Sequence, residues 1–155
     1  MGLLGQMFRL YTVAAPTEGA GAEDRRPVQL RLDDVHRRLE MLAERPSEHA
    51  VEDRAKLDHL AHDFERILSV RNAEGQRLEE SGHEDAAVEL YEANVADMYA
   101  GSSPYSRLID IYERRGETRE VQRIARACLA HALVDLPADV RAVCLSIVVR
   151  AEQHK

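Results

Sequence analysis

The stretch DHLAHDFE contains the residues whose types and spacing come closest to a metal site. His59 and His62 are three residues apart, so on a helix they occupy neighbouring positions, and Asp63 follows directly. Two histidines at this spacing can share a metal ion such as zinc. The simpler interpretation is a set of exposed polar positions on a helix. We therefore expect no bound metal here.

The His-Asp doublet also resembles helical phosphohydrolases that bind metals. Such enzymes need a further histidine and a further aspartate brought in from other helices. His36 and Asp110 are available, but nothing in their surroundings commits them to that role. A helical metal-dependent phosphohydrolase-like enzyme using His59, His62 and Asp63 is therefore kept as an alternative function.

Two cysteines and a histidine form a second candidate for metal binding. Cys128 and His131 are three residues apart, and Cys144 falls on the next expected helix. A structural zinc site needs four ligands, and the fourth is missing. Cys128 lies on a packing face, where a free cysteine behaves as a small hydrophobic residue. The sequence also has no glycine-rich phosphate loop and no nucleophile elbow, so it predicts no cofactor and no enzyme.

The composition is typical of a soluble, mostly helical chain of one domain. Of the 155 residues, 45% are hydrophobic and 32% are charged, and tryptophan is absent. The net charge of −7 argues against nucleic acid as a partner, because binding to phosphates needs a basic surface. Two cysteines make no disulfide framework, which favours the cytoplasm. No apolar run approaches the roughly 18 residues of a membrane span.

Turn-forming residues divide the chain into three parts. Residues 14–27 are small, polar and rich in turn formers, which predicts a flexible linker. Residues 1–13 form a short apolar segment that favours a helix, although FRLYTV and VQLRL also alternate and are compatible with two short paired strands. Residues 28–155 are expected to form a single all-α domain.

Apolar stripes with helical spacing recur through this domain. Asp33 or Asp34 is expected to cap the first helix and Ser47 the second, and Pro46 separates the two. The second helix would exceed thirty residues, so a break near residues 70–75 is left open. The expected helices are 33–45, 47–80, 84–99, 104–115, 118–134 and 138–152.

The chain repeats itself at an offset of 34 residues. Gly82 and Gly116 are separated by this distance, and each follows one expected helix and precedes another. Glycine is favoured at such a helix end because the residue after the helix adopts the left-handed conformation. A fixed period of this length is typical of helical-repeat arrays.

The positions around these glycines resemble the tetratricopeptide repeat, whose pattern is W-x2-L-G-x2-Y, a glycine turn, and A-x3-F. The resemblance covers hairpins at about residues 68–100 and 102–135. The first copy departs from the pattern at Arg71 and Glu74, and both copies have a late closing proline, which predicts second helices about one turn longer than usual. The matching positions are Tyr105, Leu108, Ile109, Tyr112, Gly116, Val121 and Ala125 in the second copy, and Gly75, Leu78, Gly82, Ala87 and Tyr91 in the first.

This resemblance implies antiparallel helical hairpins stacked as a short array, with capping helices at 33–45, 47–80 and 138–152. It also implies a non-enzymatic adaptor or regulator that binds a peptide or helix of another protein on the concave face of the first helices. An arginine on this face can donate two hydrogen bonds to one carboxylate. A partner with an acidic residue or a free C-terminus would therefore fit this face. The residues expected to contact it are Ala73, Gln76, Glu80, Arg107, Asp110 and Arg114, with Glu79 and Glu113 beside them.

Two further arrangements remain open at this point. A homodimer that pairs through the 47–80 helix would make the chain a dimeric regulator. The apolar segment 1–13, tethered by its linker, could instead dock in its own groove, in the groove of a second copy, or on a membrane surface, for which Arg9 alone is weak support. A disordered terminus or an extra core element is the simpler alternative.

Overall fold

The predicted all-α fold is confirmed by a computed structural model, which describes residues 24–45 and 49–153. Apart from one isolated bridge between Gly101 and Asp135, the described residues contain no strand. The segment 1–13, most of the linker and the predicted cap Ser47 lie outside the described residues. The helices are α2 (Val28–Glu44), α3 (Ala50–Glu80), α4 (Glu84–Ala96), α5 (Ser103–Arg114), α6 (Thr118–His131) and α7 (Ala138–Gln153).

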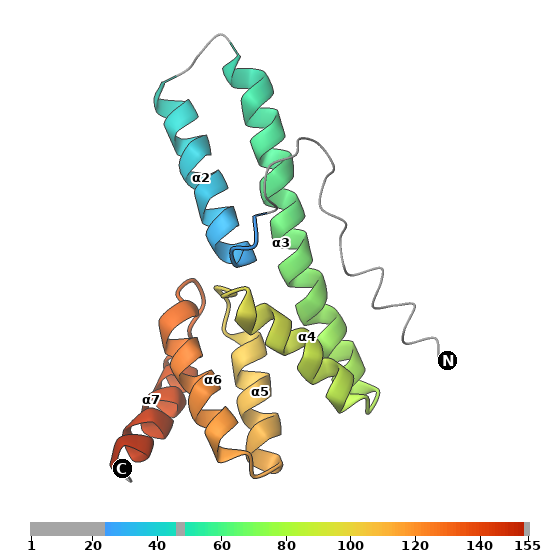
Figure 1. The fold of residues 1–155 in the computed structure, drawn as a ribbon, viewed down its shortest axis with the longest axis vertical. Helices are drawn as coiled ribbons and strands as arrows, with labels where there is room; N and C mark the ends of the chain where they lie inside the picture. Colours follow the sequence, from blue (N-terminus) through green and yellow to red (C-terminus); the bar gives the residue numbers. More distant parts are fainter. Residues whose placement is uncertain (1–23, 46–48, 154–155) are drawn as a thin grey trace.

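Consecutive helices run in opposite directions, and each packs mainly against its neighbours in the sequence (Figure 1). Helices α3, α5 and α7 point one way, and α2, α4 and α6 point the other way. Helix α2 and the first half of α3 form a hairpin at one end of the elongated molecule, and α4 to α7 form the other end. An array in which contacts are made mainly between sequence neighbours is how helical-repeat proteins are built.

The hydrophobic core is divided into two clusters, and α3 runs past both of them. In the first cluster, α2 contributes three buried residues and α3 contributes four. The second cluster joins α4, α5, α6 and α7 around fully buried tyrosines and aliphatic side chains. The first cluster comprises Val28, Leu32, Val35, Leu57, Ala61, Phe64 and Leu68, and the second centres on Tyr91, Tyr105, Leu108, Ile111, Ile124, Cys128 and Cys144.

Helix α2 begins earlier than the sequence indicated. Its first residue is Val28 and its N-cap is Pro27, so the prediction that Asp33 or Asp34 caps it is wrong. The alternative in which VQLRL forms a strand is also wrong, because these residues form the first turns of α2. The first amides of α2 have no partner within the helix and bond outside it: those of Val28 and Gln29 donate to Asp97.

Helix α3 is continuous over 31 residues, so there is no break near residues 70–75. Gly75, at the edge of that stretch, is buried under the ring of Tyr91. A Cβ atom at Gly75 would lie 2.5 Å from Cε1 of Tyr91, a distance that no side chain tolerates. The amide of Asn94 in α4 also donates to the carbonyl oxygen of Leu68, at 3.0 Å. The glycine therefore lets α3 and α4 approach closely and does not interrupt the helix.

The two predicted glycine helix ends are confirmed. Gly82 and Gly116 have φ angles of +81° and +71°, and each ends a helix with the same pair of hydrogen bonds. The amide of the residue after the glycine bonds to the carbonyl five positions back, at 2.8 Å for His83 and 2.9 Å for Glu117. This is the Schellman arrangement, which satisfies carbonyl groups left free at the helix end.

A third helix end has the same geometry without a glycine. Met98, which falls within the expected 84–99 helix, instead follows the end of α4 with a φ of +58°. The second helices of the two hairpins, α4 and α6, end at Ala96 and His131, before the expected ends at 99 and 134. The extra turn that the late prolines predicted is therefore absent. Helix α6 ends at His131, and three residues later the amide of Val134 donates to the carbonyl of Ala100 at 3.3 Å.

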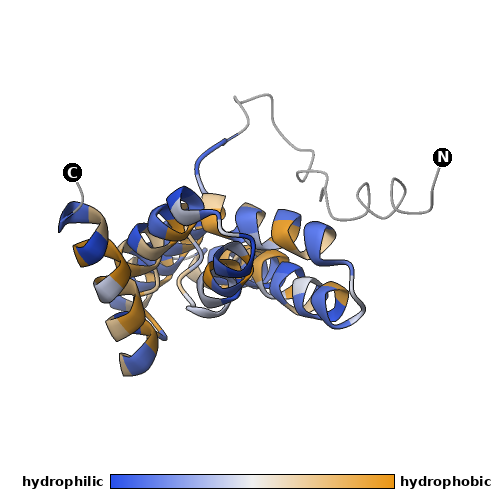
Figure 2. Cartoon of the chain, turned by 90° about the horizontal axis from the view of Figure 1, so that it is seen from below, coloured by the Kyte–Doolittle hydropathy of each residue, from blue (hydrophilic) through white to orange (hydrophobic). Residues whose placement is uncertain are grey.

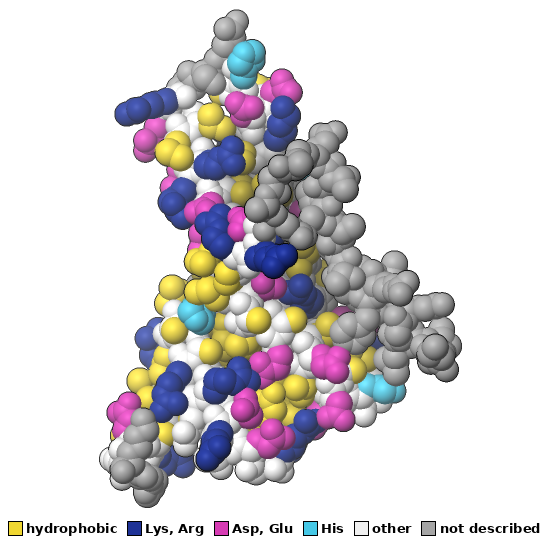
Figure 3. Space-filling model, viewed as in Figure 1, with side chains coloured by type: hydrophobic (Ala, Val, Ile, Leu, Met, Phe, Trp, Pro, Cys, Tyr) yellow, Lys and Arg dark blue, Asp and Glu magenta, His cyan; other side chains and the backbone are white. Residues whose placement is uncertain are grey.

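The connection after α6 is apolar and open to solvent. Leu133 and Val134 are 77% and 83% exposed. Figure 3 shows hydrophobic side chains gathered in this region, below α2, while charged side chains dominate the surface of the α2–α3 hairpin.

Candidate binding surface

The six residues predicted to contact a partner lie on two neighbouring helices. Ala73, Gln76 and Glu80 are on the last turns of α3, and Arg107, Asp110 and Arg114 are on α5. All six are exposed except Gln76, which is half-buried. Their role in binding stays a prediction, but the structure brings the two helices into direct polar contact.

Two side-chain contacts join α3 to α5 at this surface. Nε2 of Gln76 donates to Oγ of Ser103 at 3.2 Å. Nη1 of Arg107 lies 3.8 Å from Oε1 of Glu79, whose other oxygen accepts a hydrogen bond from the Tyr91 hydroxyl at 3.1 Å. The first helices of the two hairpins are thus held side by side by residues at the surface itself.

The other arginine of the predicted set is paired within the chain as well. Arg114 donates to Glu84 at 2.5 Å, and Arg115 bonds to the second oxygen of the same carboxylate at 2.7 Å. These hydrogen bonds, first from Arg114 and then from Arg115, lower the pKa of the Glu84 carboxyl. Arg114 therefore helps to fix the start of α4 against the end of α5.

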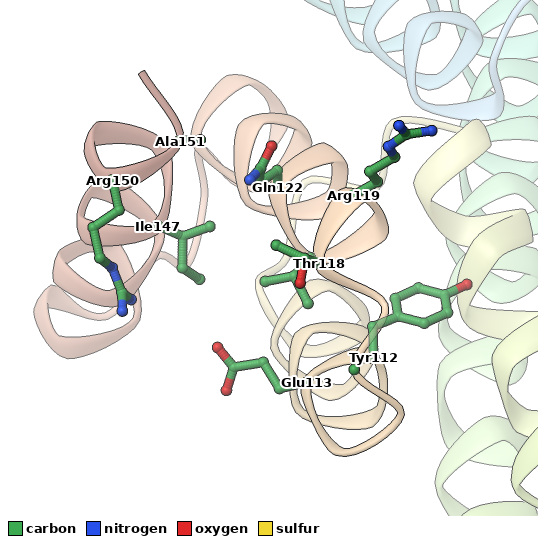
Figure 4. A pocket seen from close by; sticks show the side chains of 10 residues that line it. Tyr112, Glu113, Thr118, Arg119, Gln122, Ile147, Arg150 and Ala151 are labelled. Atoms are coloured by element: carbon green, nitrogen blue, oxygen red, sulfur yellow. The ribbon is translucent and has the colours of Figure 1, made fainter. Parts of the chain in front are cut away.

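A cleft opens between α5, α6 and α7, next to the predicted surface. Its volume is 820 Å³. Figure 4 shows Ile147 of α7 directed toward α6, with Glu113 of α5 and Arg150 of α7 at the rim. Glu113 is one turn from Asp110, so the rim of the cleft lies beside the predicted surface on α5. The lining residues are Tyr112, Glu113, Gly116, Thr118, Arg119, Val121, Gln122, Ile147, Arg150 and Ala151.

The cleft combines an apolar floor with a polar rim of both charge signs. Val121, Ile147 and Ala151 supply the apolar surface, and Glu113 and Arg150 supply opposite charges. Such a lining suits a ligand with one apolar group and several hydrogen-bonding groups, as a peptide has.

Tyr112 lines the cleft but directs its ring and its hydroxyl away from α7. Figure 4 shows the ring turned away from α7, and its hydroxyl donates to Oε1 of Glu92 at 2.6 Å. Burial and this hydrogen bond raise the pKa of Tyr112. Its hydroxyl group therefore stays protonated and serves to join α5 to α4.

The sequence did not indicate this cleft. None of the six predicted residues lines it, although Glu113 had been placed beside them, and α7 had been expected only to cap the array. A cleft formed by three helices depends on their relative tilt, which helical periodicity does not report. The one available signal was the turn at Gly116, which brings the ends of α5 and α6 together.

The histidines considered for metal binding are not gathered into one site. Nε2 of His59 lies 3.7 Å from Oδ2 of Asp63 on the same helix, and the His59 side chain is 80% exposed. His36 lies 3.8 Å from Glu65 instead of joining them. Within residues 24–45 and 49–153, no group of three or more His, Cys, Asp or Glu side chains is placed to hold a metal.

The two cysteines face each other between α6 and α7. Both are free and fully buried. A hydrogen bond with Cys144, together with burial, raises the pKa of the Cys128 thiol. The same hydrogen bond lowers the pKa of the Cys144 thiol. The two side chains pack the interface between α6 and α7 as small hydrophobic residues.

Comparison with known proteins finds no matching family model, no matching curated protein and no matching solved structure. The resemblance to tetratricopeptide repeats thus rests on positions of the sequence alone. No helix in the described part of the chain is both long and apolar enough to cross a membrane.

Proposed function

We propose that this chain is a non-enzymatic protein-interaction module, an adaptor or regulator that binds a peptide or helix of another protein. The partner would lie along the outward face of α5 and place an apolar side chain in the cleft between α5, α6 and α7. The observation that carries this proposal is the cleft itself, with its apolar lining, its rim of opposite charges and its position beside the outward face of α5.

The dimensions and lining of the cleft favour a peptide. Its 820 Å³ falls within the range of about 300–1,000 Å³ that ligand-binding pockets occupy. Thr118 and Gln122 at the start of α6 offer donors and acceptors for peptide groups, while Ile147 offers apolar contact. The exposed row on α5 then extends the contact through Asp110 and Glu113 beyond the cleft.

The repeated helix ends give this surface a rigid frame. Gly82 and Gly116 close α3 and α5 with the same hydrogen bonds at an interval of 34 residues. A binding surface carried on rigid helices loses little conformational entropy when a partner binds. This supports the interpretation of the two hairpins as tetratricopeptide-like units, which remains a proposal.

The test is selection of binders from a displayed peptide library, followed by measurement of affinity for two variants. Gln122→Trp would fill the cleft with an indole ring, because Gln122 lines it. Arg126→Trp is the matched control, because Arg126 is exposed on the same helix and does not line the cleft. We expect selected peptides to lose at least about 30-fold in affinity for Gln122→Trp, the effect of losing a hot spot, and to bind Arg126→Trp as they bind the wild type.

Two results would contradict the proposal. One is a library that yields no peptide binding above background to the wild-type chain. The other is a set of peptides that bind Gln122→Trp as tightly as the wild type, which would place the binding site outside the cleft.

A further inference from the structure

Helix α7 is apolar on its outward side as well as on its inward side. Cys144 and Ile147 are buried against α6, the helix with which α7 makes its main contacts. On the opposite side, Ala142, Leu145 and Val149 follow one another at intervals of three and four residues and form a single stripe. Leu145 and Val149 are 48% and 50% exposed.

This stripe lies at an end of the helical array. Figure 2 shows α7 at the edge of the molecule with hydrophobic colouring along much of its length. The terminal helix of a repeat array normally turns a polar face to water, because an apolar face there lowers solubility. An apolar end therefore indicates that something covers the outward stripe of α7.

Charged residues along both edges of the stripe indicate what covers it. On one edge, Arg141 and Glu152 are eleven residues apart, which is three helical turns. On the other edge, Asp139 and Arg150 are also eleven residues apart. All four side chains are exposed, and none forms an ion pair with another residue of the described chain.

Each edge carries opposite charges at its two ends, so the face of α7 is complementary to itself. When two such helices pack antiparallel about a two-fold axis, each edge meets the same edge of the other copy in reversed direction. Arg141 then lies opposite Glu152 of the second copy, and Asp139 lies opposite Arg150 of the second copy. The centres of the two edges differ by two residues, or about 3 Å along the axis, which long arginine side chains can span.

We propose that two copies of this chain form an antiparallel homodimer through the outward stripe of α7. Leu145 and Val149 of each copy form the dry centre of the interface, and the four ion pairs form its rims. The antiparallel direction is favoured because it places the positive end of each helix dipole beside the negative end of the other. Leu145 and Val149 do not line the peptide-binding cleft, so the dimer does not depend on the proposed function, although Arg150 lies at the rim of both surfaces.

The first experiment measures the mass of the full-length chain in solution by sedimentation equilibrium. We expect a dimer at about 100 μM that dissociates on dilution, as weak single-helix interfaces do. Leu145→Glu should raise the dissociation constant at least about 30-fold, because it places a charge in the centre of the interface. Leu133→Glu is the matched control: it makes the same exchange at a side chain that is 77% exposed, in the connection before α7 and outside the stripe and its edges.

The second experiment determines the direction of pairing by exchanging charges. Arg141→Glu places two acids opposite each other and should weaken the dimer about ten-fold at low salt, with less effect at high salt. Combining Arg141→Glu with Glu152→Arg restores both pairs only in an antiparallel dimer. Combining Arg141→Glu with Asp139→Arg restores them only in a parallel one.

Each remaining outcome would overturn the proposal. A chain that stays monomeric throughout would show that another segment or another protein covers the stripe. Equal losses in Leu145→Glu and Leu133→Glu would show that the interface is not the stripe. Rescue by Asp139→Arg but not by Glu152→Arg would replace the antiparallel dimer with a parallel one. Circular dichroism of each variant checks that the helices remain folded.

Discussion

The carboxylate of Asp97, just after α4, accepts a hydrogen bond from the backbone amide of Val28, the first residue of α2, at 3.1 Å. The two residues are 69 positions apart in the sequence. The backbone carbonyl of Asp97 also accepts from Gln29, and its second carboxylate oxygen pairs with Arg71 of α3. One residue thus supplies the N-terminal cap that α2 lacks in its own sequence and links three helices.

Replacing Asp97 with alanine should therefore destabilise the fold. The substitution removes the cap and leaves Arg71, whose side chain is only 20% exposed, without its partner. We expect a loss of about 1–3 kcal/mol in the free energy of unfolding, measured by urea denaturation. Asp97→Asn is the matched control, since the amide oxygen still caps α2 while the charge is lost, and its loss should be smaller. Equal losses in both variants would show that the charge, and not the cap, is what matters.

Substitution of Gly116 tests the helix end without disturbing any packing. No atom lies within 4 Å of the position that a Cβ would take, so the cost of Gly116→Ala arises from the φ of +71° alone. We expect a loss of about 1 kcal/mol in unfolding free energy for Gly116→Ala. Gly116→Asn should lose less, because asparagine tolerates the left-handed region. Unchanged stability in Gly116→Ala would mean that this turn readily adopts another conformation.

Acid should weaken the contact between α4 and α5 through Glu84. The folded-state pKa of this carboxyl lies below its ordinary value of 4.5, because Arg114 and then Arg115 donate hydrogen bonds to it. A lowered pKa contributes stability that is fully present above the ordinary value and is lost as the pH falls through the folded-state value.

Urea midpoints for the wild type and Glu84→Gln, measured from about pH 6 down to pH 3, should therefore converge as the pH falls. The control is Glu89→Gln, an exposed position on the same helix, which should follow the wild-type curve. A gap between wild type and Glu84→Gln that stays constant with pH would contradict the assignment.

Elemental analysis separates the proposed interaction module from the metal-dependent alternative. We expect zinc, manganese and iron to be well below one atom per chain in protein purified from metal-replete medium. The exposed His59 and His62 have one nearby carboxylate, that of Asp63, which is too few ligands for a stable site. A stoichiometric metal that disappears in His59→Ala/His62→Ala would establish the alternative.

Helix positions followed from local patterns, whereas helix ends often did not. The stripe of α3 and the glycines at 82 and 116 were readable because periodicity and the left-handed conformation are properties of a few adjacent residues. The start of α2 was misplaced because its cap comes from Asp97, far away in the sequence. Met98 was misplaced because a non-glycine residue occupies the left-handed position there.

The candidate site was less predictable than the fold. The outward faces of α3 and α5 could be identified from the 34-residue interval, and Arg107 does lie beside Glu79. Arg114 could not be known to bond with Glu84, because that contact depends on the turn geometry between α3 and α4. The cleft beside Ile147 depends on the placement of α7, for which the sequence offered no repeat to follow.

Helix α3 is shared by two separate cores, and this makes the molecule uneven in its resistance to opening. Only α2 and the first half of α3 depend on the smaller core, so this end can unravel while the tyrosine-rich end keeps its shape. Backbone amides of α2 should then exchange with deuterium well before those of α5 and α6. A partner bound beside α5 would sit on the part of the chain that moves least.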